Sequence, residues 1–453
     1  MRKKVTAFDF VFITLLLYSL VPFSREILLF RFGGVPVGYI PFLIFFAWLF
    51  LRELVRGLRA RRIGFGWGEF FLAILLFIYL PFQLFVLKNL SRGVDVRDYL
   101  LDYAMFCTYG ITAYFGTRLY FVNQGEQALI VANRVVERML NVFFIICIVA
   151  PIRYFLFDHG VAFFYSTFNV LPYRMFVPLF LVPSSLLALG RFFATRRVRY
   201  LLFFALYGGN IYLCQSRTGY IAYACVLGYL LIRERLGIIL RPQWVVAGLV
   251  FAATFYMGGQ KARQRIARLK EIQLFASLDL ESAAELEKDK RRIALLVGSL
   301  ELFQESPWLG VGLGKRNLHA NFPSYYLKYS PSVTRPHNFY LSVLISLGIF
   351  GSSLLFLFLF FSVYRPRYFI DAKFIQDRVL REFVRHLYLC HIAILVMQLG
   401  YEFETTPFIW FLWGLSSGVF RLVGKGRGYQ ENAVPFQASG YQKQVGGGNL
   451  AYR

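Results

Sequence analysis

The chain has 453 residues, of which 57% are hydrophobic, and it contains 51 phenylalanines and 29 tyrosines. Its mean hydropathy of +0.53 exceeds what a soluble domain of this length needs, so the composition indicates an integral membrane protein. A net charge of +25 would indicate nucleic-acid binding in a soluble protein, but here the arginines cluster between apolar segments. We interpret them as topology signals and as contacts to anionic lipid or phosphate, and we expect no nucleic-acid partner.

Apolar windows of roughly 17–25 residues predict an all-α membrane fold with about twelve transmembrane helices. A basic N-terminus without a small-residue cleavage site precedes the first window, which is therefore interpreted as a span and not as a removed signal. All five cysteines fall inside apolar segments, so no disulfide framework is expected. The helices are expected near residues 7–24, 36–54, 68–88, 98–119, 139–157, 174–194, 198–214, 217–233, 243–258, 338–364, 384–402 and 406–422.

These windows divide the chain into four parts. Residues 1–258 carry helices one to nine, residues 259–337 form one large polar loop, residues 338–423 carry helices ten to twelve, and residues 424–453 form a polar tail. The tail is rich in Gly and Gln, and we expect it to be disordered.

Positive charge gathers in alternate connections between the predicted helices. The segments 52–62 and 365–385 are net basic, whereas 401–405 carries little excess charge. Under the positive-inside rule the basic connections are cytoplasmic, which agrees with an even number of spans and with both termini inside. The large loop between helices nine and ten is then extracytoplasmic.

The large loop contains one predicted helix and one predicted turn. Ser282 and Glu285 fit a capping box, and apolar residues recur after them at helical spacing, which predicts an amphipathic helix near 283–304. Its apolar stripe, expected to lie on the membrane domain or the outer leaflet, comprises Leu286, Ile293, Val297, Leu300 and Phe303. The sequence "ESPWLGVGLG" then predicts a tight turn with exposed backbone amides.

His337 stands at the outer mouth of predicted helix ten, directly after Arg335 and Pro336. The proline favours an extended approach, and Asn338 is expected to start the helix. A neutral imidazole at this position can take a proton from a hydroxyl, a role that contributes about 10²–10⁴ in rate. The alternative is an interfacial histidine that is hydrogen-bonded to the backbone.

Arg217, in "CQSRTGY", separates two apolar runs at a very short turn. A charge in a transmembrane segment is costly, so such residues tend to line cavities where they have a partner. A guanidinium suits a diphosphate because it binds two oxygens at once and stays charged. The alternative is an arginine that extends to the membrane interface.

Further arginines of the loop are candidate phosphate ligands. The segment 261–270, "KARQRIARLK", contains no acid, and its Arg263 and Arg265 follow soon after the predicted end of helix nine. Arg292, in the predicted loop helix, and Arg335, beside His337, complete the candidate set. The alternative for each of them is contact with anionic headgroups or with solvent.

Two motifs that could indicate a nucleotide-binding loop or a zinc site do not meet the requirements of those sites. The sequence "GVGLGKR" lacks the Ser or Thr of a phosphate-binding loop and follows no strand. His386 and His391 are five residues apart on one helix and do not share a face, so they do not indicate zinc. We therefore predict neither a metal nor a cofactor.

Three segments together resemble the O-antigen ligase and polymerase superfamily, which assembles bacterial envelope glycans. They are "FQESPWLGVGLG" at 303–314, "HNFYLSVLISLGIFG" at 337–351 and "QSRTGY" at 215–220. Thr218 is a mild departure, because many relatives have Gly or Ser there. The order of the motifs and the large loop before helix ten also fit this family.

The resemblance implies an inverting, metal-independent glycosyltransferase with a GT-C-like helical fold. Its donor would be a glycan on a polyprenyl (undecaprenyl) diphosphate, and its acceptor either lipid A–core or a growing O-antigen or exopolysaccharide chain. The family's essential histidine corresponds to His337, its turn arginine to Arg217, and its early-loop arginine to Arg263 or Arg265.

The sequence leaves open whether the chain is a ligase or a polymerase. From a different class, it could be a lipid-linked glycan flippase or a solute transporter. Transporters tend to show repeats, broken helices and charged residues at mid-membrane. Here the candidate polar residues gather at one surface and in one loop, which favours an enzyme.

Overall fold

The computed structural model describes residues 6–20, 31–32, 35–36, 40–60, 65–89, 94–156, 176–213, 217–234, 287–327, 336, 338–399 and 407–425. Within these ranges the regular structure is helical, apart from the antiparallel two-residue strands β1 (Arg31–Phe32) and β2 (Val35–Pro36). The helices, with π-helices and 3-10 helices labelled η, are α1 (Asp9–Leu20), α3 (Ile40–Arg59), α4 (Trp67–Ile74), η2 (Leu75–Tyr79), α5 (Leu80–Asn89), α6 (Val96–Thr108), η3 (Tyr109–Phe115), α7 (Gly116–Asn123), η4 (Gly125–Gln127), α8 (Ala128–Leu156), α10 (Phe176–Thr195), α11 (Val198–Leu213), α12 (Arg217–Glu234), α17 (Glu287–Glu305), α18 (Lys315–Asn321), α19 (Ser324–Leu327), α20 (Phe339–Leu359), η6 (Phe360–Tyr364), α21 (Arg367–Asp371), η7 (Ala372–Phe374), α22 (Arg378–Gln398) and α23 (Pro407–Lys425).

The apolar windows of the sequence coincide with helices wherever the structure describes them. By length and composition alone, three helical segments of the described ranges are apolar enough to cross a bilayer, namely Trp67–Asn89, Val177–Thr195 and Phe339–Phe374, the last of which contains a break at Gly348. The expected ninth span, 243–258, lies outside the described residues. The all-α membrane fold is thus supported, while the number of crossings stays a prediction.

Two of these segments differ strongly in how much of their apolar surface is buried. The segment Trp67–Asn89 leaves large apolar side chains exposed, among them Phe77, Ile78 and Phe85, as expected of a helix that faces lipid. In contrast, 94% of the span in α10 is buried inside the protein. Helix α10 is therefore enclosed by neighbouring helices, among them α11 and α22.

Hydrogen bonds fix the directions of the helices around α10. Arg378, at the start of α22, donates to the carbonyl of Phe193 near the end of α10 (2.8 Å), and the Cys390 thiol donates to the carbonyl of Pro183 (3.2 Å). Helices α10 and α22 are therefore antiparallel. The Tyr223 hydroxyl of α12 donates to the carbonyl of Phe204 in α11 (2.9 Å), so α11 and α12 are antiparallel as well.

These pairings define two ends of the bundle. At one end, which we call the basic end, α10 ends and α11 and α22 begin, and Arg191 and Arg199 both contact Glu137 of α8 (3.8 and 2.8 Å). At the other end, α11 ends, α12 begins with Arg217, and α22 ends at Gln398. Helix α12 also packs against α22.

A buried ion pair ties further helices together. Glu69, near the start of α4, and Arg118 of α7 are both buried, with 2.5 Å between Oε1 and Nε. The Tyr114 hydroxyl and the Ser417 hydroxyl of α23 donate to the same carboxylate oxygen (3.0 and 3.3 Å). Because an unpaired charge would be costly among apolar helices, this cluster fixes α4, α7 and α23 relative to one another.

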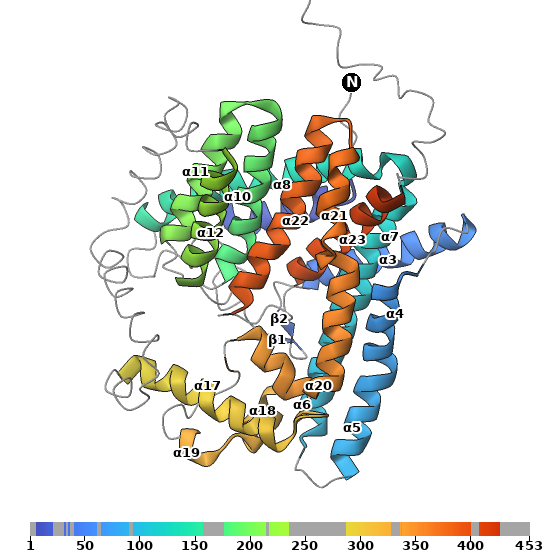
Figure 1. Ribbon diagram of the computed structural model, residues 1–453, viewed down its shortest axis with the longest axis vertical. Helices are drawn as coiled ribbons and strands as arrows, with labels where there is room; N and C mark the ends of the chain where they lie inside the picture. The colour runs from blue at the N-terminus through green and yellow to red at the C-terminus, as the bar shows by residue number, and fades with distance from the viewer. Residues whose placement is uncertain are drawn as a thin grey trace, which may run out of the picture.

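Helix α20 is broken at Gly348, whose φ of 62° and ψ of −172° are not helical. The rings of Phe339 and Tyr340 lie 6.5 and 6.2 Å from the ring of Phe356. In a straight helix these residues would be about 25 Å apart, so the two halves of α20 fold back on each other (Figure 1). The prediction of one continuous span over 338–364 is therefore wrong at this point.

The turn after α17 fills the break in α20. Four backbone hydrogen bonds join the two segments: the amides of Val311 and Gly312 donate to the carbonyls of Ile345 (2.8 Å) and Ser346 (3.1 Å), and the amides of Ile349 and Phe350 donate to the carbonyls of Pro307 (2.8 Å) and Trp308 (3.3 Å). The break exposes helix carbonyls and amides that have no helical partner, and the turn supplies those partners. The expectation that the amides of the turn are exposed is therefore wrong for Val311 and Gly312.

Helix α17 occupies Glu287–Glu305, close to the amphipathic helix expected near 283–304. Its buried face differs from the predicted stripe, because Leu295 and Leu302 pack against Val311 and Ile345 whereas Leu300 is 46% exposed. The fold-back of α20 brings its first half against α17, and this contact decides which face of α17 is covered (Figure 1). The proposed capping box lies outside the described residues.

The break in α20 predicts a specific sensitivity to substitution. Gly348→Ala should lower the free energy of unfolding by about 1–3 kcal/mol, because alanine is strained at this φ and its Cβ would collide with the carbonyl of Trp308. Gly228→Ala in α12 is the matched control, since a Cβ there meets nothing within 4 Å. Thermal unfolding in detergent should show a loss for the first variant and no loss for the second; equal behaviour would contradict the break.

Candidate active site

The first half of α20 begins beside the end of α22. The Asn338 side-chain amide donates to the carbonyl of Leu399 (3.1 Å), and the Tyr340 hydroxyl donates to the carbonyl of Leu395 (2.9 Å). Since α12 begins with Arg217 at this same end of the bundle, the starts of α12 and α20 share one end. We call it the convergent end; it lies opposite the basic end.

Asn338 holds the start of α20 in two ways. Its Oδ1 atom accepts a hydrogen bond from the amide of Leu341 (3.1 Å) and so caps the helix, while its Nδ2 atom reaches Leu399. The helix cap was expected from the sequence, but the contact with α22 was not. Pro336, two residues earlier, is buried. The described neighbours on both sides of position 337 are therefore fixed in the fold.

The six candidate residues are only partly described. Arg217 and Arg292 have described backbones, as the first residue of α12 and as part of α17, but their side chains lie outside the described part of the structure. The others, namely His337, Arg335, Arg263 and Arg265, lie outside the described residues altogether. Of the candidate set, the fold thus locates the backbone of Arg217 at the convergent end and that of Arg292 on α17.

A buried side-chain staple holds the broken helix and the turn in place. The Gln83 amide donates to the carbonyls of Leu309 and Ser346, the latter at 2.8 Å, and Gln83 is fully buried. The Tyr99 hydroxyl donates to the Oε1 atom of Gln83 (2.7 Å). The Tyr79 hydroxyl donates to the carbonyl of Leu347 and lies 3.3 Å from the carbonyl of Leu309. We call Tyr79, Gln83 and Tyr99 the staple.

Sequence reasoning missed the staple, although a signal was present. Gln83 is an amide inside the apolar run of Trp67–Asn89, and a polar side chain in a membrane helix usually has a partner on another element. Its partners are backbone carbonyls freed by a break that was not foreseen. The polar side chain in an apolar run indicated that Gln83 has a partner, but the sequence could not identify that partner.

A second set of contacts fixes the far side of the turn to α6. Asp95 caps α6 by accepting from the amide of Asp98 (3.0 Å), and its carboxylate pairs with Arg316 (3.2 Å). The Asp98 amide, followed by Arg316, lowers the pKa of Asp95 below its usual value of 3.8. The ionised Asp95 carboxylate therefore stabilises the fold at pH values above 3.8, and this stabilisation is lost only as the pH falls below 3.8. Asn317 also accepts from the amide of Asp95 (2.6 Å), so α18 is held at neutral pH.

The staple gives a second prediction. Gln83→Met keeps the length of the side chain but removes its hydrogen bonds to the carbonyls of Leu309 and Ser346 and to the Tyr99 hydroxyl. Each of these three groups keeps one other partner, so we expect a loss of about 1–3 kcal/mol in total. Gln127→Met, at an exposed glutamine, is the control and should leave stability unchanged. Unfolding midpoints in detergent measure both; an unchanged midpoint for Gln83→Met would show that the staple is not formed.

Comparison with protein families identifies the part of the chain that contains this geometry. Residues 202–356 match a family model described as O-antigen ligase. The match begins within α11 and ends in the second half of α20, so it includes the start of α12, helix α17, the turn and the break. A comparison with curated proteins finds no match.

Proposed function

We propose that the chain is a membrane glycosyltransferase of the O-antigen ligase superfamily. The family match over residues 202–356 supports this proposal. It transfers or polymerises a glycan from a polyprenyl-diphosphate carrier onto an acceptor hydroxyl. The observation that carries the proposal is that α12 and α20 both begin at the convergent end of the bundle. Arg217 begins α12, and His337 directly precedes the Asn338 cap of α20.

The proposed reaction is a displacement at the anomeric carbon of the donor sugar. The acceptor oxygen forms a bond to this carbon while the bond from the carbon to the diphosphate oxygen breaks, and the electron pair leaves with the diphosphate. The imidazole of His337 takes the acceptor proton. Attack from the face opposite the leaving group inverts the anomeric configuration.

Arginine side chains would stabilise the leaving diphosphate, where negative charge grows most in the transition state. Arg217 is the first candidate, because a guanidinium binds two phosphate oxygens at once. Arg263 or Arg265 is the second, and Arg335 and Arg292 are further candidates for donor or acceptor binding. In this mechanism the arginines supply the positive charge that a divalent metal provides in other glycosyltransferases.

The distribution of charge supports an orientation for the reaction. The basic end carries Arg191, Arg199 and Arg378, and it lies opposite the convergent end. Under the positive-inside rule the basic end faces the cytoplasm, which places the convergent end at the outer face of a bacterial inner membrane. The acceptor there is lipid A–core for a ligase, or a growing O-antigen or exopolysaccharide chain for a polymerase.

The roles of His337 and Arg217 are tested by transfer activity in membranes. His337→Ala should lower the rate by about 10²–10⁴, and Arg217→Ala by about 10²–10³, with expression unchanged. Arg217→Lys keeps the charge but loses the two-oxygen geometry, so its activity should lie between wild type and Arg217→Ala. Arg97→Gln, at an exposed arginine of α6, is the control and should keep full activity.

If His337→Ala and Arg217→Ala keep near wild-type glycan chain length and yield, the proposed mechanism is wrong. The acceptor is identified separately, by deleting the gene in the native host and separating its surface glycans on a gel. Loss of long O-chains with lipid-linked polymer retained indicates a ligase, and single-repeat chains indicate a polymerase. Loss of secreted polymer alone indicates exopolysaccharide synthesis.

A further inference from the structure

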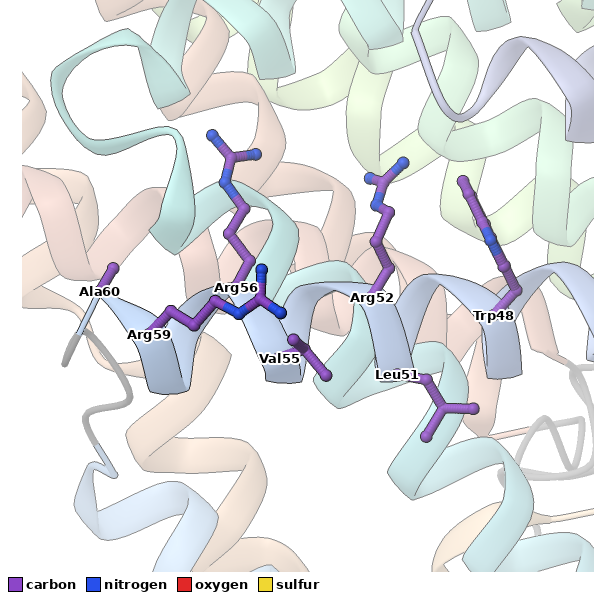
Figure 2. Close-up of a pocket in the computed structure, with 7 residues that line it drawn as sticks. All are labelled: Trp48, Leu51, Arg52, Val55, Arg56, Arg59 and Ala60. Atoms are coloured by element: carbon purple, nitrogen blue, oxygen red, sulfur yellow. The ribbon is translucent and has the colours of Figure 1, made fainter.

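Helix α3 carries an open groove of about 770 Å³ along its last three turns, away from the convergent end. Its lining residues are Trp48, Leu51, Arg52, Val55, Arg56, Arg59 and Ala60. Figure 2 shows Trp48, Arg52 and Arg56 extending to one side of the helix and Leu51 to the opposite side. The spacing of four residues places the first three side chains in one row.

Within the ranges that the structure describes, the arginines of this groove outnumber the acidic groups that pair with them. Glu53 is fully buried, pairs with Arg52 (2.5 Å), and accepts from the amide of Asn123 (3.0 Å). Arg56 lies 3.9 Å from the same carboxylate, and within the described part of the chain Arg59 makes no ion pair. Two guanidinium groups therefore share one carboxylate, while a third has no ion pair in the described ranges, and both Arg56 and Arg59 are exposed.

Apolar side chains line the same groove beside the arginines. Leu51, Val55 and Leu58 are all largely exposed, and Val55 lies one turn before Arg59, so the aliphatic row adjoins the arginines. Trp48 is half-exposed, and the guanidinium of Arg52 lies 4.4 Å from its ring centroid. Such a helix, with arginines next to exposed aliphatic and aromatic residues, is typical of the interface between headgroups and acyl chains.

The position of the groove fits this interface. Glu53 is tied to Asn123, which ends α7 and lies just before the start of α8. The first part of α8 carries Glu137, which contacts Arg191 and Arg199 at the basic end. The groove therefore belongs to the basic end and is separate from the proposed donor site.

We infer that this groove is a binding site for an anionic phospholipid. The guanidinium groups of Arg56 and Arg59 bind the phosphate of the headgroup, and Arg52 stays with Glu53 and Trp48. The acyl chains lie along Leu51 and Val55. Charge complementarity selects the occupant: a zwitterionic lipid offers a phosphate together with a cation, which the unbalanced arginines disfavour, whereas an anionic lipid offers the phosphate alone.

The test measures lipid retention by the full-length protein. The protein is purified in detergent, incubated with phosphatidylglycerol or phosphatidylcholine, and examined by native mass spectrometry. Wild type should retain phosphatidylglycerol in preference to phosphatidylcholine. The double variant Arg56→Gln/Arg59→Gln should bind phosphatidylglycerol about 30-fold more weakly, since each arginine near anionic lipid contributes roughly a factor of five.

Two further variants keep the test specific. Arg197→Gln/Arg365→Gln removes the same charge from exposed arginines outside the groove and should leave retention unchanged. Arg56→Lys/Arg59→Lys keeps the charge and should keep most of the preference. Equal retention of the two lipids by wild type, an equal loss in both glutamine variants, or displacement of the lipid by equimolar inorganic phosphate would each overturn the inference. Transfer activity is measured in parallel, so failure here is distinct from failure of the proposed function.

Discussion

The break of α20 at Gly348 is the constraint on which the rest of the arrangement depends. A glycine at positive φ allows the chain to reverse, and the reversal leaves carbonyls and amides without helical partners. The turn at 306–312 supplies those partners from the backbone, and Gln83 supplies another from a neighbouring helix. Two motifs that are separated in the sequence are therefore one structural unit, in which neither half would be stable alone.

The reversal decides where the start of α20 lies. In a straight span, the start of α20 would lie about one helix length away from Phe356. In the folded-back arrangement the Phe339 ring lies beside the Phe356 ring, and Asn338 contacts the end of α22. Helix α12 begins at that same end of the bundle because the helices from α10 to α12 alternate in direction. A site built there would draw its groups from two helix starts that are held by rigid neighbours, which suits chemistry that requires fixed geometry. The charge of the bundle gathers at the other end, where the α3 groove lies.

Hydropathy in the sequence located helices within the described ranges, as in α10 and α11, while the count of twelve spans stays a prediction. It was not sufficient to locate the break. Gly348 sits in the apolar run "LISLGIFG", where a glycine is compatible with either a continuous or a broken helix. The buried face of α17 was misjudged for the same reason, since the fold-back determines which residues it covers. The family motifs indicated His337, Arg217 and the loop arginines, but their side chains lie outside the described structure, so their roles stay predictions.

The most direct test of the account is chemical crosslinking across the break in α20. Cysteines replace Tyr340 and Phe356 in a background without the five native cysteines, and a short bifunctional thiol reagent is added. The folded-back arrangement predicts a crosslink, because the two rings are 6.2 Å apart. A pair of the same sequence separation in α22, at Leu380 and Val396, should not react, since about 24 Å separates them along a straight helix. If the α20 pair is as unreactive as the α22 pair, α20 is a straight span, and the proposed convergent end does not exist.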